Sequence, residues 1–178
     1  MVIYLDIETA GKSADEGEVI AIGLLKGNRV EVRLSWEPGG ERRLLEWLED
    51  ELEEGETVVT WYGSGFDIPF LLARSALLGV ELPRLCNAPK LDLCEWCRQN
   101  LKLSSYGLES VSKFLGIERE VEFAGKDVPT LHKLALEGDE KARSLIARHC
   151  EEDLRLLRGV HEKLKPYVEV GSWRNSTG

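Results

Sequence analysis

The N-terminal part of the chain alternates apolar and polar positions in the way that is typical of β-strands. We predict strands over Val2–Glu8, Val19–Leu25 and Val30–Trp36, because all three segments are rich in β-branched and aliphatic residues. Gly27 and Asn28 provide the turn between the second and third segments. Connections this short indicate that the three strands form an antiparallel meander.

Beyond residue 40 the apolar positions mostly follow a helical period. The pattern predicts an amphipathic helix over Glu41–Glu54, a short buried strand over Thr57–Tyr62, and a helix that starts near Pro69 and ends before Gly79. Further helices are expected at about 93–100, 107–115, 130–136 and 139–164. This order predicts an α/β fold in which a mixed β-sheet is flanked by α-helices.

The length of 178 residues suits one domain. We expect that domain to span residues 1–168 and to be followed by a flexible tail over 169–178. The net charge of −9 argues against a long nucleic-acid tract, because proteins that neutralise many phosphates are usually basic. A few terminal nucleotides remain compatible with this charge if metal ions supply the local positive charge.

No apolar run approaches the roughly 20 residues that a membrane-spanning helix needs, and the N-terminus opens directly into a strand-like segment. We therefore expect a cytoplasmic protein without a membrane partner.

The four cysteines are Cys86, Cys94, Cys97 and Cys150. The pair at 94 and 97 has CxxC spacing, which leaves a zinc site or a disulfide open, but buried or incidental thiols are the favoured interpretation.

Two carboxylates lie in the first predicted strand. Side chains alternate along a strand, so Asp6 and Glu8 project from the same face while Ile7 enters the core. Two adjacent carboxylates repel each other, and a Mg²⁺ or Mn²⁺ ion with oxygen ligands would offset that cost. The alternative is a strand end that is exposed to solvent.

Further chemical groups follow later in the chain. Asp67 comes after a strand and a Gly-rich loop, where it could cap a helix or lie at the carboxyl edge of the sheet. His149 and Asp153 are four residues apart and therefore share one helical face. A solvated acidic face and a buried His–Asp pair are the structural alternatives for these two residues.

Three of these segments resemble, in the same order, the three motifs of the DEDD exonuclease superfamily. They are YLDIET at residues 4–9, GFDIPFL at 65–71 and HCEED at 149–153. The segment YGLESV at 106–111, with FLG at 114–116, resembles the helix that precedes the third motif. The resemblance spans about residues 2–160 and is closest to the proofreading domains of B-family DNA polymerases and their free-standing relatives. It implies a ribonuclease H-like fold.

The resemblance also implies a function, a metal-dependent 3′–5′ exonuclease that acts on single-stranded DNA or RNA 3′ ends with two Mg²⁺ or Mn²⁺ ions. Asp6, Glu8 and Asp153 would hold one ion, and Asp6 and Asp67 would hold the second, partly through water. His149 would orient or deprotonate the attacking water. Here the chain departs from the family, because it combines the histidine of one branch with the spacing of the tyrosine-type branch.

Substrate contacts are expected from Thr9, Phe66 and Tyr106. Trp61 and Tyr62 are further candidates for stacking on terminal bases, although core packing is the favoured interpretation for Trp61 and Phe66.

Basic and histidine residues elsewhere carry weaker expectations. Lys102, Lys126 and Arg148 could meet phosphates or could be solvated surface residues. His132 and His161 are expected on helix surfaces.

Two rival functions remain. One is an endonuclease or RNA–DNA hybrid nuclease on the same fold, against which the Phe66-Asp67 motif argues. The other is a catalytically weak, ribonuclease H-like nucleic-acid-binding module that acts with a larger repair or replication complex. The sequence leaves open the choice between DNA and RNA, the oligomeric state and the protein partners.

Overall fold

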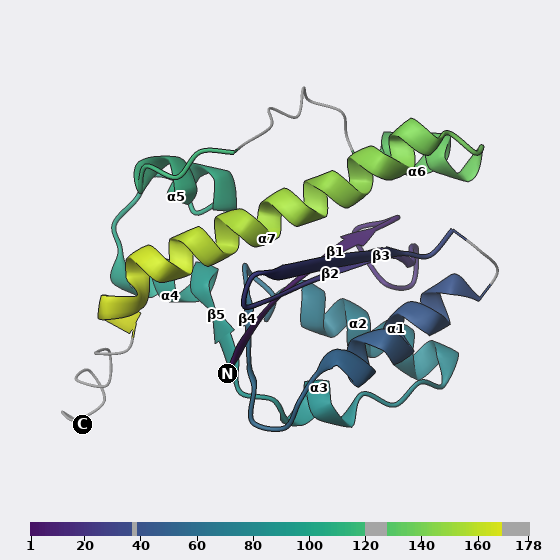
Figure 1. The fold of residues 1–178 in the computed structure, drawn as a ribbon, viewed down its shortest axis with the longest axis horizontal. Helices are drawn as coiled ribbons and strands as arrows, with labels where there is room; N and C mark the ends of the chain where they lie inside the picture. The colour runs from purple at the N-terminus through teal and green to yellow at the C-terminus, as the bar shows by residue number, and fades with distance from the viewer. Residues whose placement is uncertain (37–38, 120–127, 169–178) are drawn as a thin grey trace.

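A five-stranded mixed sheet in the order β3-β2-β1-β4-β5 forms the centre of the computed structural model, which describes residues 1–36, 39–119 and 128–168 (Figure 1). The strands are β1 (Val2–Thr9), β2 (Val19–Lys26), β3 (Arg29–Leu34), β4 (Thr57–Thr60) and β5 (Lys90–Asp92). β1 pairs antiparallel with β2 and parallel with β4. β2 pairs antiparallel with β3, and β4 pairs parallel with β5. The predicted three-strand meander is therefore confirmed.

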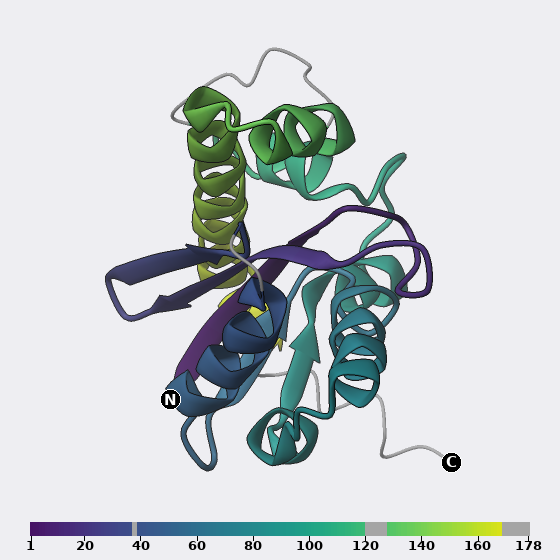
Figure 2. The ribbon, with the colours of Figure 1, turned by 90° about the vertical axis from the view of Figure 1, so that its right-hand side faces the viewer.

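Helices cover both faces of this sheet (Figure 2). One face carries α1 (Gly40–Glu51), α2 (Asp67–Leu78) and α3 (Pro83–Asn87). The long helix α7 (Glu140–Val168) crosses the other face, and α5 (Leu108–Phe114) and α6 (Val128–Leu136) pack against it. Helix α4 (Leu93–Asn100) follows β5 directly.

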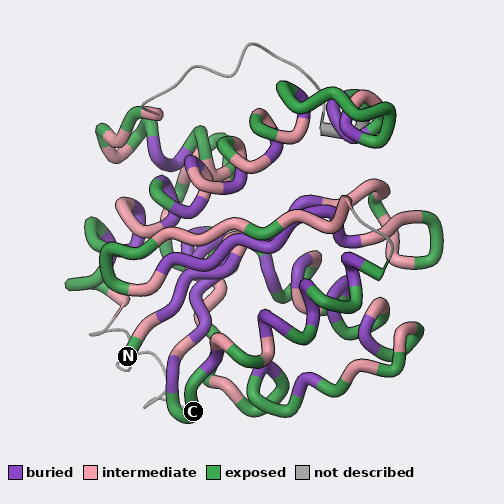
Figure 3. The backbone as a smooth tube through the Cα atoms, turned by 45° about the vertical axis from the view of Figure 1, so that its right-hand side comes forward, coloured by how far each residue is buried: buried purple, intermediate pink, exposed green. Residues whose placement is uncertain are grey.

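The alternation along β1 separates the two halves of the core. Ile3, Leu5 and Ile7 pack with residues of α1 and α2, whereas Tyr4 packs with Leu154 and its neighbours on α7. The central strands are buried along most of their length, as Figure 3 shows. Because Asp6 and Glu8 follow the parity of Tyr4, their side chains face α7, as the alternation predicted.

Close packing of α7 on the sheet depends on Gly23, which pairs with Asp6 across β1 and β2. A Cβ atom at this position would lie 2.4 Å from Cys150 Sγ and 2.8 Å from Leu154 on α7. The glycine therefore lets the helix approach the sheet beside Asp6.

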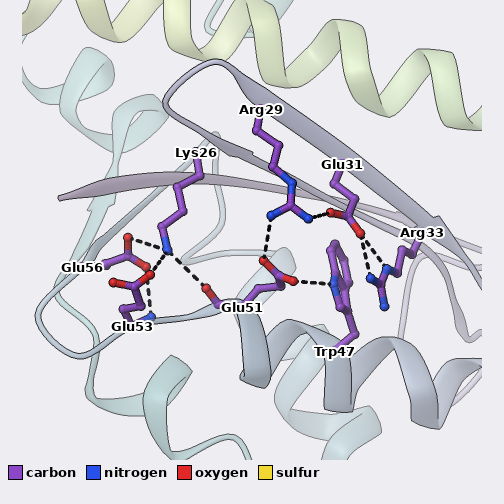
Figure 4. A network of polar contacts seen from close by, with 8 residues as sticks. All are labelled: Lys26, Arg29, Glu31, Arg33, Trp47, Glu51, Glu53 and Glu56. Atoms are coloured by element: carbon purple, nitrogen blue, oxygen red, sulfur yellow. Dashed lines mark hydrogen bonds and ion pairs between the residues drawn. The ribbon is translucent and has the colours of Figure 1, made fainter.

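A polar network ties the β2–β3 hairpin to the end of α1 (Figure 4). Lys26 Nζ lies 2.7 Å from Glu53 and 3.0 Å from Glu56. The Arg33 guanidinium lies 4.6 Å from the centre of the Trp47 ring. These contacts hold the edge of the sheet against α1.

The structure adds two elements to those that the sequence predicts, namely α3 and β5. β5 has only three residues, and two of them are charged, so it carries no apolar alternation. The other predicted strands and helices are present with shifts of a few residues at their ends. The expected tail at 169–178 lies outside the described residues.

The prediction that His132 and His161 are surface residues is wrong. Their exposed fractions are 7% and 8%. His132 stacks on Trp36 with 5.9 Å between ring centres, and His161 Nδ1 lies 2.9 Å from the Tyr4 hydroxyl. Both imidazoles are packed against other aromatic side chains, which the sequence pattern alone did not reveal.

In the described part of the chain, no helix is both long enough and apolar enough to cross a membrane.

Candidate active site

Asp6 lies near the carboxyl end of β1 beneath α7, and one of its oxygens lacks a partner. Oδ2 is buried and accepts no hydrogen bond from the described residues. Burial raises the pKa of Asp6 well above its usual range, and neighbouring carboxylates raise it further; these are Glu8, Asp153 and Asp67. The electrostatics therefore place all four predicted carboxylates around one point of the fold.

Glu8 is also buried, but a histidine accompanies it. His149 Nδ1 on α7 lies 2.7 Å from Glu8 Oε1. Burial raises the pKa of Glu8, and the hydrogen bond with His149 opposes that rise. The same hydrogen bond raises the pKa of His149. The pair thus links β1 to α7.

Asp67 is the first residue of α2, so Phe66 occupies the cap position and makes no side-chain capping bond. The backbone N–H groups of Asp67 and Ile7 are close enough to the Asp67 carboxyl group to lower its pKa. Burial, which those N–H groups oppose, raises its pKa to about 7. Of the two roles that the sequence left open, this geometry favours the one at the sheet edge, because the carboxylate is directed towards β1.

A loop between β4 and α2 positions Asp67, and Asp92 holds that loop. Asp92 Oδ1 accepts the Tyr62 N–H at 3.0 Å, and Oδ2 accepts the Ser64 N–H at 2.9 Å and its hydroxyl at 2.5 Å. Asp92 also caps α4 by accepting the Glu95 N–H at 3.1 Å. Sequence analysis missed Asp92, although an Asp directly before the predicted helix at 93–100 is a capping signal.

The same loop needs unusual backbone geometry. Tyr62 has a φ of 60°, in the left-handed region that non-glycine residues rarely adopt. A Cβ atom at Gly63 would lie 2.3 Å from the Thr60 hydroxyl, and one at Gly65 would lie 2.4 Å from the Tyr62 ring. The Gly-Ser-Gly sequence is therefore required for the turn that leads into α2.

Arg119 is the second residue that sequence analysis missed. Its guanidinium pairs with Asp153 Oδ1, and only 16% of the Arg119 side chain is exposed. His149 Nδ1 lies 3.7 Å from the other Asp153 oxygen. Arg119 follows α5 in a segment without periodic pattern, so no sequence signal connects it with α7.

The donor set fits a divalent cation. Among the described residues no three His, Cys, Asp or Glu side chains converge in a preformed metal-binding arrangement. The His149 imidazole contacts Glu8, and the Arg119 guanidinium contacts Asp153. Yet the Asp6 oxygen without a partner among the described residues, and the raised pKa values of Asp6 and Asp67, indicate carboxylates whose negative charge is disfavoured in the absence of a cation. Carboxylate oxygens are the ligands that Mg²⁺ and Mn²⁺ prefer.

The residues that we expect to contact substrate differ in the contacts that they make within the protein. Thr9 Oγ1 donates to the Gly11 carbonyl at 2.7 Å, and Phe66 packs on Phe70 with 5.6 Å between ring centres. Tyr106 donates its hydroxyl to the Leu101 carbonyl at 2.9 Å. Their substrate roles stay predictions, and the core-packing interpretation agrees with the contacts of Phe66.

Two further aromatic residues flank the site. The Trp61 indole N–H donates to the Tyr106 carbonyl at 3.2 Å, so Trp61 helps to hold the segment that contains Tyr106. Tyr62 is 41% exposed, and the Arg98 guanidinium lies 4.8 Å from its ring centre. Tyr62 is thus the more accessible of the two for stacking.

The phosphate contacts that the sequence suggested for three basic residues stay predictions. Lys102 and Arg148 are exposed, and Lys126 lies outside the described residues.

The cysteines do not add to the site as metal ligands. All four are free thiols, and Cys94, Cys97 and Cys150 are buried. Cys150 Sγ lies 3.8 Å from the Asp6 carbonyl oxygen, which makes it part of the packing between α7 and β1.

Comparisons with known proteins agree with the fold. A family model of the RNase H superfamily matches residues 3–165. An uncharacterized protein of Methanocaldococcus jannaschii is 31% identical over 161 residues, which cover 84% of this chain and 87% of that protein. The DNA polymerase catalytic subunit of Alcelaphine herpesvirus 1 is 29% identical over 80 residues, which cover 45% of this chain and 7% of the subunit.

The fold is also similar to a solved structure. The family B DNA polymerase from the hyperthermophilic archaeon Pyrobaculum calidifontis superposes with a TM-score of 0.78 at 21% identity. The match covers 93% of this chain and 24% of the polymerase. The chain thus corresponds to a small part of both polymerases, and at this identity the structural likeness concerns the fold.

Proposed function

The chain belongs to the RNase H superfamily, and we propose that it is a metal-dependent 3′–5′ exonuclease that releases nucleotides from single-stranded DNA or RNA ends. The observation that carries the proposal is the carboxylate cluster around Asp6, whose Oδ2 atom is buried and has no partner in the part of the chain that the structure describes. Three segments that lie far apart in the sequence contribute to it, and in each the carboxylate occupies the motif position of the DEDD superfamily. The superfamily supports a nuclease, and the motifs support the exonuclease polarity.

We propose that Asp6, Glu8, Asp67 and Asp153 hold two Mg²⁺ or Mn²⁺ ions. When bound, such ions lower the pKa of a coordinated water and stabilise charge on the scissile phosphate and the leaving oxygen. The chain contributes carboxylates on ordered elements: Asp67 begins α2, where the backbone N–H groups of Asp67 and Ile7 favour its charged form, and Asp6 lies on a central strand. Fixed ligands of this kind favour efficient catalysis because little reorganisation is needed.

His149 would orient or deprotonate the attacking water. Its hydrogen bond to Glu8 fixes the orientation of the ring and raises the pKa of the imidazole. An imidazole that titrates near neutrality is suited to accept a proton from water. The carboxylates would hold the metal ions that stabilise charge in the reaction. We therefore expect removal of an Asp to cost more activity than removal of His149.

One observation favours a second candidate function, a catalytically weak module that binds nucleic acid within a larger assembly. The Arg119 guanidinium contacts Asp153 and the His149 imidazole contacts Glu8, and a protein that had lost metal binding would retain such contacts.

The proposed test uses single-stranded DNA and RNA oligonucleotides that carry a 5′ label, with Mn²⁺, Mg²⁺ or EDTA. We expect a ladder of shortened products that requires metal and is absent in Asp6→Asn. The matched control is Asp50→Asn, which makes the same change at an exposed position of α1. A folded protein that leaves both strands intact and does not bind Mn²⁺ would contradict the exonuclease and support the binding module.

A further inference from the structure

A cavity of about 410 Å³ lies beside the edge strand β3, apart from the carboxylate cluster. Arg33 and Trp36 line it from β3 and the residues after it, Gly40 and Arg43 from the start of α1, and Arg143 from α7. Figure 1 shows that the end of β3, the start of α1 and the start of α7 lie at the same end of the molecule. The volume lies in the range of small-molecule binding sites.

The lining of this cavity is cationic although the protein as a whole is acidic. Among the described residues that line it, the ionisable ones are all arginines, in a chain of net charge −9. Arg33 contacts Glu31 at 2.8 Å, and Arg143 contacts Glu140 at 2.7 Å. Each guanidinium carries five N–H donors, so these contacts leave donors for a ligand.

The start of α1 adds to the positive potential. Gly39 occupies its cap position with a φ of 71° and provides no side-chain cap. The acidic residue of the first turn, Glu41, is buried and directed elsewhere, because its carboxylate accepts from Arg74 at 2.7 Å and from the Val19 N–H at 2.8 Å. The N-terminal N–H groups of a helix of this length favour an anion.

The aromatic residue in the cavity indicates which part of a nucleotide would bind. The Trp36 ring stacks on His132 at 5.9 Å, and the Arg143 guanidinium lies 5.5 Å from its centre. These two groups engage the indole ring, so the cavity offers guanidinium groups beside the N-terminus of α1 rather than a stacking surface. This donor set recognises phosphate oxygens.

The cavity also lies at the same end of the sheet as the carboxylates, where β1 and β3 both end. Leu34, which lines it, pairs with Ala21 on β2, and Ala21 pairs with Glu8 on β1. Two strand spacings separate Leu34 from Glu8, which corresponds to about 10 Å. A strand of nucleic acid with its end at the carboxylates can therefore place an internal phosphate at the arginines.

We propose that Arg33, Arg43 and Arg143 form a phosphate-binding site, whose ligand is either an internal phosphodiester of the nucleic-acid strand or the phosphate group of a free nucleotide. If the ligand is a phosphodiester of the nucleic-acid strand, the inference rests on the proposed function. If the ligand is a free nucleotide, it does not.

Binding is measured with the full-length Asp6→Asn protein in EDTA, so that no hydrolysis is possible. The probes are fluorescent dodecathymidylate, fluorescent dithymidylate and inorganic phosphate, the last followed by thermal shift. The test variant is Arg43→Gln/Arg143→Gln. The matched control, Arg42→Gln/Arg155→Gln, removes the same charge from the same two helices at side chains that are 48% and 45% exposed.

For a strand-derived phosphate, we expect the test variant to bind the dodecanucleotide about tenfold more weakly and the dinucleotide unchanged. The slope of log K against log salt falls by about 0.7 for each phosphate that the variant no longer neutralises. A free phosphate predicts instead that the variant loses the phosphate-induced rise in Tm while dodecanucleotide binding is unchanged. Control and test variants that behave alike with every probe would overturn the proposal.

If the double variant does not fold, Arg43→Gln alone makes the same test, because Arg43 is exposed on α1. An absence of nuclease activity in the parent protein leaves these binding results readable, so failure of the proposed function and failure of the phosphate site are distinguishable.

Discussion

Among single residues, Asp6 is the carboxylate around which the unfavourable electrostatics of the candidate site are concentrated. Its buried Oδ2 atom has no partner among the described residues, and burial together with three neighbouring carboxylates disfavours its charge. Asparagine has the same shape and no charge. We therefore expect Asp6→Asn to stabilise the metal-free protein by about 1 kcal/mol, which corresponds to a rise in Tm of about 2–4 °C for a chain of this size.

The same variant should lose most of the stabilisation that Mn²⁺ gives to the native protein, because a ligand that binds only the folded state raises Tm. Thermal unfolding with Mn²⁺ and with EDTA measures both effects, and Asp50→Asn serves as the control. An unchanged Mn²⁺ response in Asp6→Asn would show that the ion binds elsewhere.

Arg119 is a second residue with a defined expectation. Its guanidinium pairs with Asp153 and competes for a carboxylate that a cation would use. We expect Arg119→Gln to bind Mn²⁺ about three- to tenfold more tightly by calorimetry, because the competing charge is gone. Its metal-free form should be less stable, since the variant removes an ion pair that is mostly buried.

The control for this prediction is Arg155→Gln, which removes a charge from α7. The Arg155 guanidinium lies 3.7 Å from the Glu151 carboxylate. Weaker Mn²⁺ binding in Arg119→Gln than in this control would mean that Arg119 organises the site and does not compete with metal.

Most residues of the candidate site could be predicted from the sequence, because each motif contains a local signal of strand alternation or helical spacing. Asp6 and Glu8 alternate on a strand, and His149 and Asp153 lie one helical turn apart. Arg119 could not be predicted, because it reaches Asp153 across 34 residues from a segment without periodicity. The burial of His132 and His161 was missed because neighbouring polar residues suggest an exposed helical face.

At the scale of elements, the loop between β4 and α2 is the part that sets the position of Asp67. Asp92 accepts hydrogen bonds from Tyr62, from Ser64 and from the start of α4. We expect Asp92→Ala to cost about 2–3 kcal/mol of stability. Because the loop also fixes Asp67, the variant should lower kcat about tenfold or more, with a smaller change in KM.

Asp139→Ala is the matched control for that prediction. Asp139 accepts the Lys141 and Ala142 N–H groups at the start of α7, and its removal should cost about 1 kcal/mol. The control should keep kcat, since the cap lies well before His149 on the helix. An equal reduction of kcat in both variants would indicate a general effect of stability.

Helix α6 provides a prediction about pH. His132 on α6 is buried against Trp36, with Glu18 at 4.0 Å, and the Arg143 guanidinium lies 5.5 Å from the same Trp36 ring. Burial lowers the pKa of His132, and Glu18 partly opposes that effect. The unfolded chain therefore binds the proton more readily, and stability should fall as the pH drops below about 6.5.

His132→Phe keeps the aromatic packing and removes the titration. The difference in Tm between the native protein and this variant should therefore change in favour of the variant as the pH falls from about 7.5 to 5.5. The raised pKa of His149 acts in the opposite direction in both proteins, so it cancels in the comparison. A difference that is constant with pH would show that His132 titrates alike in the folded and unfolded chains.

Long elements with a clear period were the predictable ones. The three N-terminal strands and α7 carry enough apolar positions to define their faces. β5 forms because parallel pairing with β4 stabilises Lys90–Asp92, and that tertiary contact is absent from the local sequence. The same holds for α3, whose five residues bury Leu85 against the core below the sheet.

At the scale of the molecule, the topology explains how the site is assembled. β1 lies in the middle of the sheet with β4 parallel beside it, so the carboxyl ends of these strands reach the same edge. α7 crosses this face and brings His149 to Glu8 over a separation of 141 residues. The resemblance to a known family supplied this assembly, since spacing alone does not specify strand order.

The measurement that tests the central claim most directly compares linear and circular single-stranded DNA with Mn²⁺, for the native protein and Asp6→Asn. We expect the native protein to shorten the linear strand from its 3′ end to nucleotides and to leave the circle intact, and the variant to leave both intact. Nicking of the circle would contradict the exonuclease in favour of an endonuclease. Survival of both substrates with the native, Mn²⁺-bound protein would contradict catalysis altogether.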